Sequence, residues 1–145
     1  MSKVIAIDPG ISKCGIVVAD IKEKKVYEAL VVKSHLLLKY ARKIYQSDKK
    51  VQFLIGNGTS SKIYIKDLNQ FAPNLIIAEE KNSTYRAKQR YFKIFPLRGI
   101  KCLLPREIFI LNKNLDALAA LIIMEDHFNI KFHVSEKLKT KTWLK

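Results

Sequence analysis

Residues 4–10 read Val-Ile-Ala-Ile-Asp-Pro-Gly, so four apolar residues run without a break into an acid. Apolar and polar residues do not alternate here, which is typical of a strand buried on both faces of a sheet. Residues 14–19 indicate a second apolar strand, which returns beside the first after a turn at Pro9 and Gly10. We therefore expect Asp8 at the carboxyl end of a central strand, where open α/β sheets place their ligands. An Asp-Pro-Gly turn with no further role is the alternative.

The net charge is the most informative property of the whole chain. Its 145 residues suffice for one compact domain, and 27 Lys and Arg against 13 Asp and Glu give a formal net charge of +14. A small domain this basic usually binds nucleic acid or another anionic surface, although a compositional bias that favours solubility is the alternative.

Nothing in the sequence predicts a membrane protein or a secreted one. No apolar run approaches the roughly 18 residues that a membrane span needs, and the chain opens directly on a strand, without a signal-peptide pattern. Cys14 and Cys102 lie in no metal-ligand spacing and are expected to be free thiols. We therefore expect a cytoplasmic protein without a membrane partner.

Strands and helices alternate after the first two strands. The elements expected are a strand over 25–32, a helix over 36–46, a strand over 51–56, a helix from 60 toward 71, a strand over 74–78 and helices over 83–93 and 115–128. An antiparallel meander followed by right-handed crossovers gives an α/β fold with a mixed five-stranded sheet between helices. The carboxyl ends of the first, fourth and fifth strands would share one edge.

Several boundaries follow from single residues. Ser34 is expected to cap the first helix, Pro73 to end the second and Asn114 to cap the last. Residues 96–113 read as irregular. We expect one domain over 1–128, followed by a mobile, basic C-terminal tail over 129–145.

Acidic residues stand where this topology converges. Asp8 ends the first strand, Glu79 and Glu80 follow the fifth, and Asp116 lies in the first turn of the last helix. Helical spacing puts Asp116 on the buried face, where a lone carboxylate is unfavourable unless something neutralises it. A solvated loop pair and an acid that complements the helix dipole are the alternatives. Successive strand residues face opposite sides, so only one glutamate can point inward; we choose Glu80, with Glu79 as the alternative.

A divalent cation shared by Asp8, Glu80 and Asp116 would neutralise the cluster, and Mg²⁺ or Mn²⁺ prefers such oxygen ligands. This chemistry suits phosphodiester hydrolysis, in which ions position water, lower its pKa and neutralise charge on the phosphate.

Basic residues near these acids are candidates for binding nucleic acid. Arg86 and Arg90 lie on the helix over 83–93, whose charged side could hold phosphates, with a solvated face as the alternative. Lys13 and Lys81 complete the predicted nucleic-acid-binding set. Residues 56–62 could present backbone N–H groups to phosphate, but they lack the P-loop residues and are interpreted as a turn and helix cap.

The acids stand in three blocks of sequence. The first is residues 5–10 with 13–18, the second is Glu-Glu-Lys-Asn-Ser-Thr at 79–84 with Ala87, and the third is residues 115–125. In this order and spacing they resemble the RuvC and YqgF (RuvX) branch of the RNase H-like superfamily over about residues 3–128. The second block is similar to that branch's Asp-Glu-Arg-x-Ser/Thr-Thr-x-x-Ala segment. The likeness is greatest to short YqgF-like proteins.

The resemblance implies an RNase H-like fold with Asp8, Glu80 and Asp116 as catalytic, metal-binding acids. It implies a hydrolase, a Mg²⁺- or Mn²⁺-dependent nuclease acting on structured RNA, since YqgF proteins are implicated in maturing the ribosomal RNA precursor. Holliday-junction resolution on branched DNA is the first alternative, but Ala119 and Ala120 occupy the helix face where RuvC resolvases carry a further acid. A non-catalytic nucleic-acid-binding module is the second alternative. The oligomeric state is left open between monomer and homodimer.

Overall fold

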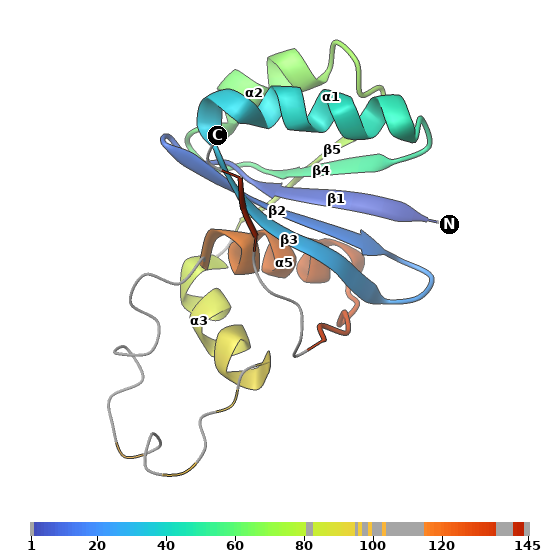
Figure 1. The fold of residues 1–145 in the computed structure, drawn as a ribbon. Coiled ribbons are helices and arrows are strands. Elements are labelled where there is room, and N and C mark those ends of the chain that lie inside the picture. Colours follow the sequence, from blue (N-terminus) through green and yellow to red (C-terminus); the bar gives the residue numbers. More distant parts are fainter. Residues whose placement is uncertain are drawn as a thin grey trace.

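A mixed β-sheet forms the centre of the protein in the computed structural model, which describes residues 2–80, 83–94, 96, 99, 103, 115–135 and 141–143. The strand order is β5-β4-β1-β2-β3-β6, and Figure 1 shows the sheet between two groups of helices. The strands are β1 (Lys3–Asp8), β2 (Lys13–Asp20), β3 (Lys25–Lys33), β4 (Gln52–Gly56), β5 (Leu75–Ala78) and β6 (Lys141–Trp143). The helices are η1 (Ser34–Leu36), α1 (Leu37–Ser47), α2 (Ser61–Leu68), α3 (Ser83–Ile94) and α5 (Leu115–Phe128).

Strand β1 is central and is buried on both faces, as its unbroken apolar run predicts. It pairs antiparallel with β2 and parallel with β4. Ile5 and Ile7 enter one hydrophobic core, whereas Val4 and Ala6 enter another on the opposite face. The period of two along a strand explains this division, because neighbouring side chains point to opposite faces.

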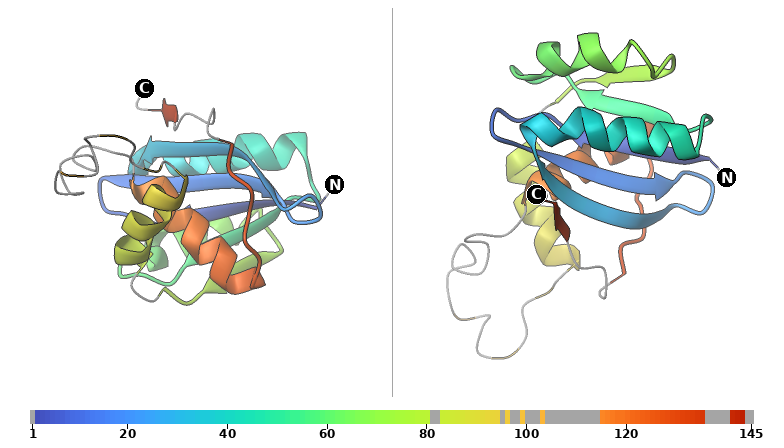
Figure 2. Two further views of the ribbon diagram at one scale, coloured as in Figure 1. Left: turned by 90° about the horizontal axis from the view of Figure 1, so that it is seen from below. Right: turned by 45° about the horizontal axis from the view of Figure 1, so that its top comes forward.

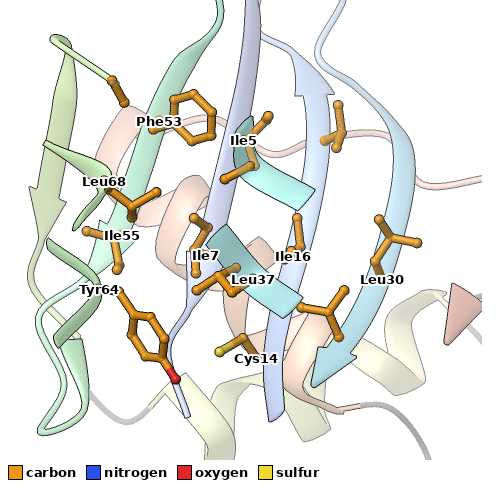
Figure 3. Close-up of a cluster of buried hydrophobic side chains, with 14 of the residues drawn as sticks. Ile5, Ile7, Cys14, Ile16, Leu30, Leu37, Phe53, Ile55, Tyr64 and Leu68 are labelled. Atoms are coloured by element: carbon orange, nitrogen blue, oxygen red, sulfur yellow. The ribbon is translucent and has the colours of Figure 1, made fainter. Parts of the chain in front are cut away.

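Helices cover both faces of the sheet. Figure 1 shows α1 and α2 on one face and α5 on the other, and both views of Figure 2 place α3 beside α5. Figure 3 shows the core beneath α1 and α2, where Leu37 and Leu68 meet Ile5 and Ile7. Ala87 on α3 packs against Ala119 of α5 because both side chains are small. Of the helices that the structure describes, none is both long and apolar enough to cross a membrane.

The parallel strands place their carboxyl ends at one sheet edge. Strands β1, β4 and β5 run parallel to one another, while β2 and β3 complete an antiparallel meander. The predicted α/β fold and its mixed five-stranded sheet are therefore confirmed, and β6 adds a short sixth strand parallel to β3.

Two helix boundaries differ from the sequence prediction. Helix α2 ends at Leu68, before Pro73 could terminate it, because a turn already follows at 69–71. Ser34 makes no cap for α1; its hydroxyl donates to the carbonyl oxygen of Gly10 instead, at 3.0 Å. The predicted cap at Asn114 and most of the irregular segment over 96–113 lie outside the described residues.

Part of the predicted C-terminal tail packs against the domain. Phe132 is buried in the core on the α5 face, and His133 exchanges backbone hydrogen bonds with the β2–β3 turn region. Strand β6 lies farther along the same segment. The domain boundary at residue 128 stays a prediction, but the described parts of 129–145 contribute to the sheet and the core.

Candidate active site

Asp8 lies at the carboxyl end of β1 among other acids. Burial, then the charges of Glu80 and Asp116, then a hydrogen bond with Glu80 raise the pKa of Asp8 from 3.8 to about 7. A like charge nearby disfavours ionisation, so Glu80 and Asp116 lie close enough to Asp8 to affect its proton. The structure thus brings the acids predicted from three separate blocks of sequence into one electrostatic environment.

Glu80 is held in a recess made by the turn after β4. A Cβ atom on Gly56 or Gly58 would crowd the Glu80 carboxylate, so both glycines make room for it. The Glu80 backbone N–H donates to Asn57 Oδ1 at 3.0 Å. Burial raises the pKa of Glu80, while hydrogen bonds with the Gly58 backbone and with Asp8 act in the opposite direction. Glu80 Oε1 is buried and has no hydrogen-bond partner among the described residues.

The neighbouring glutamate differs in its surroundings. Glu79 is exposed, whereas Glu80 is partly buried and touches the turn after β4. This difference supports Glu80 over the alternative Glu79 as the acid directed into the site.

Asp116 reaches the site because α5 begins against β2. A Cβ atom on Gly15 would overlap the Asp116 carbonyl group, so only glycine permits this close approach. Gly15 is also the cross-strand neighbour of Asp8. The Asp116 side chain is 32% exposed and its Oδ2 lies 3.1 Å from Lys13 Nζ. Asp116 therefore faces a cation at the site rim and is not turned away into open solvent.

The acids suit a hard divalent cation by their chemistry. Their oxygens are the ligands that Mg²⁺ and Mn²⁺ prefer. Glu80 Oε1 has no hydrogen-bond partner among the described residues, and burial and the neighbouring acids disfavour the ionised form of Asp8. A bound cation would stabilise the ionised form of both carboxyl groups. Within the described part of the chain, however, no three acidic, His or Cys side chains are arranged as a complete metal site. The acids share one environment without forming a closed ligand shell.

The predicted nucleic-acid-binding residues have different surroundings. Lys13 is 53% exposed beside the acids, and Lys81 lies outside the described residues. Arg86 forms a two-point ion pair with Asp126 at the surface. Arg90 is mostly buried and binds Glu125 inside the fold, so it serves to join α3 to α5, which differs from its predicted surface role.

The glycines around the site are the residues that sequence reasoning missed. The sequence predicts a turn and helix cap at 56–58, and the structure shows that this turn also encloses Glu80. Its position directly after a parallel strand could have indicated this, because such turns lie at the ligand-bearing edge. Gly15 gave no such signal, since its need for close approach depends on a helix a hundred residues away.

The architecture is that of the RNase H-like fold, a mixed sheet with an antiparallel meander and two parallel strands between helices. Among solved structures, the chain is similar to "T. thermophilus RuvC in complex with Holliday junction substrate", with a TM-score of 0.51 and 12% sequence identity. The match covers 92% of this chain and 100% of RuvC. At this identity the likeness shows the fold alone. No protein-family model and no curated protein matches the sequence.

Proposed function

We propose that this protein is a divalent-metal-dependent nuclease that hydrolyses phosphodiester bonds of structured nucleic acid. The observation that carries the proposal is the position of Asp8 beside Glu80 and Asp116: burial first, and then the charges of these two acids, raise the pKa of Asp8 to about 7. Crowded acids in a chain of net charge +14 are suited to a cation that in turn binds a phosphate.

In this proposal the three carboxylates hold Mg²⁺ or Mn²⁺, which supplies activation of water and neutralisation of charge on the phosphate. Asp8 ends β1 and Glu80 follows β5, two parallel strands that lie on either side of β4. The turn at 56–58 fixes the Glu80 backbone and leaves its Oε1 available as a ligand. Lys13, beside Asp116, would contact the substrate backbone, and Lys81 and Arg86 are proposed as further contacts to it.

Structured RNA, as in processing of the ribosomal RNA precursor, is the proposed substrate. This choice depends on the resemblance of the segment 79–87 to the YqgF branch. The structural neighbour, which was solved with a Holliday junction substrate, favours branched DNA as the second candidate. Paired cuts on such a junction need two sites, so a homodimer would support the second candidate and a monomer the first. We propose that the protein acts in the cytoplasm.

The test is a cleavage assay on labelled structured RNA and on four-way DNA junctions, with Mg²⁺ or Mn²⁺ and with chelator. The variants are Asp8→Asn and, as a matched control, Asp67→Asn on α2, outside the acidic cluster. Cleavage that needs metal and is lost only in Asp8→Asn supports the proposal, and the relative rates on the two substrates decide between RNA and DNA. Salt-sensitive binding without any cleavage would instead indicate a non-catalytic module.

A further inference from the structure

The loop that follows Asp8 is held by a cluster of donors on one carbonyl oxygen. The Tyr64 hydroxyl donates to the Gly10 carbonyl oxygen at 2.8 Å, and the Ser34 hydroxyl donates to the same oxygen at 3.0 Å. Cys14 Sγ lies 3.8 Å from it. The Ser34 backbone N–H also donates to the carbonyl oxygen of Ser12, at 3.1 Å. These contacts attach both ends of the short loop to neighbouring elements.

The donors come from the layer opposite to α5. Tyr64 lies on α2 and Ser34 on η1, and Figure 3 shows Tyr64 at the same end of the apolar cluster as Cys14. The rest of that cluster is almost entirely aliphatic or aromatic. A phenylalanine would fill the space of the Tyr64 ring equally well. The hydroxyl is therefore used for the loop and not for packing, because a buried hydroxyl needs a partner.

The same loop connects two groups of the acidic site. Asp8 precedes it directly, and Lys13, at its far end, binds Asp116. Gly10 keeps the loop tight, since a Cβ atom there would overlap the Lys13 carbonyl oxygen. A shift of the Gly10 carbonyl would thus move the Asp8 carboxylate relative to Glu80.

We infer that Tyr64 and Ser34 are positioning residues, whose hydroxyls fix the Gly10 carbonyl and thereby aim Asp8 at a divalent cation shared with Glu80. The inference rests on the proposed function and deepens it. Outer residues that orient metal ligands typically change metal affinity by about 10- to 100-fold when they are removed. Because Tyr64 acts through a backbone carbonyl, we expect the lower end of that range.

The test is calorimetric titration of the full chain with Mn²⁺, combined with amide hydrogen exchange of Gly10–Lys13 in metal-free protein. The variants are Tyr64→Phe and Ser34→Ala, with Ser34→Thr to retain the hydroxyl. Tyr45→Phe is the matched control, because Tyr45 packs on the same face of the sheet against Phe71, away from the loop.

We expect Tyr64→Phe and Ser34→Ala to weaken Mn²⁺ binding about tenfold and to speed exchange in the loop, with Ser34→Thr and Tyr45→Phe close to wild type. We also expect Tyr64→Phe and Tyr45→Phe to unfold at similar denaturant midpoints. The weaker Mn²⁺ binding of Tyr64→Phe would then come from the position of the loop and not from a less stable fold. Wild-type Mn²⁺ affinity in Tyr64→Phe would overturn the inference and leave the proposed function standing. A wild-type chain that does not bind Mn²⁺ would overturn both.

Discussion

The buried acid Glu125 and the acids at the sheet edge have opposite surroundings. Glu125, on α5, has a fully buried side chain, yet its oxygens accept from Arg90 Nη2 at 2.9 Å, Lys131 Nζ at 2.9 Å and the Phe132 backbone N–H at 3.0 Å. It is an acid whose charge is compensated within the fold. These contacts of Glu125 join α5 to α3 and to the segment that follows α5.

The acids at the sheet edge lack comparable partners within the part of the chain that the structure describes. Asp8 lies beside two other carboxyl groups, and Glu80 Oε1 has no hydrogen-bond partner among the described residues. Among the described residues, Asp116 is the one edge acid that forms an ion pair, with Lys13. Buried charges are ordinarily paired. The contrast with Glu125 supports the proposal that the edge acids bind a cation from outside the chain.

The largest expected effect is on catalysis. Asp8→Asn keeps the side-chain shape but removes a ligand charge, so nuclease activity should fall about 1,000-fold, or about 4 kcal/mol of transition-state stabilisation. Initial rates at saturating Mg²⁺ on the better substrate measure this. Activity within tenfold of wild type would show that the edge acids are not the site.

Removing the charge of Glu125 and removing the charge of Glu80 should have different effects on the free energy of unfolding. Glu125→Gln leaves the mostly buried Arg90 uncompensated and should lower the free energy of unfolding by about 3 kcal/mol. Glu80→Gln removes a charge from a crowded cluster and should leave stability equal or raise it. Urea denaturation in chelator compares the two variants, and equal losses of stability would show that Glu80 and Glu125 are compensated alike.

The same crowding predicts a pH dependence of stability without metal. The pKa of Asp8 is raised to about 7 in the folded chain, so the folded state binds the proton more tightly than the unfolded state. The contribution of Asp8 to the free energy of unfolding is therefore complete below about pH 4 and is lost as the pH rises through 7. Between pH 5 and 7 the loss should be about 2 kcal/mol.

Denaturation of wild type and Asp8→Asn in chelator across this range tests the slope. Asp8→Asn should lose most of this dependence of stability on pH, and saturating Mg²⁺ should suppress the dependence in wild type. A wild-type slope that rises toward pH 7 would contradict the raised pKa.

The smallest effect concerns Lys13. Its ion pair with Asp116 is half exposed, so Lys13→Met should change stability by less than about 1 kcal/mol. Mn²⁺ affinity should rise about two- to fivefold because the ammonium no longer competes for Asp116. The salt dependence of nucleic-acid binding should lose about one unit of slope. Lys22→Met, at an exposed turn, is the matched control; identical behaviour of both variants would remove Lys13 from the site.

Much of the fold follows from local pattern. The uninterrupted apolar run of β1 predicts its central place, and the parallel strands bring Asp8 and Glu80 to one edge. Asp116 could be predicted from the conflict between its charge and its position on an apolar helix. These features depend on periodicity and on charge, which a sequence carries directly.

Other features depend on contacts between distant residues. Arg90 reads as a surface residue because its partner, Glu125, is 35 positions away. The roles of Gly15 and Tyr64 likewise become visible only when α5 and α2 are placed against the sheet. Strand β6 is short and lysine-bearing, so its pattern resembles a solvated tail.

The most direct test of the account is anomalous diffraction from crystals soaked in Mn²⁺. We predict a peak bonded to carboxylate oxygens of Asp8 and Glu80, with Asp116 as a further ligand to it or to a second ion roughly 3.5–4 Å away. The ion should also displace Lys13 from Asp116. Ordered carboxylates without a peak between them, at a Mn²⁺ concentration that fills other sites on the protein, would contradict the account.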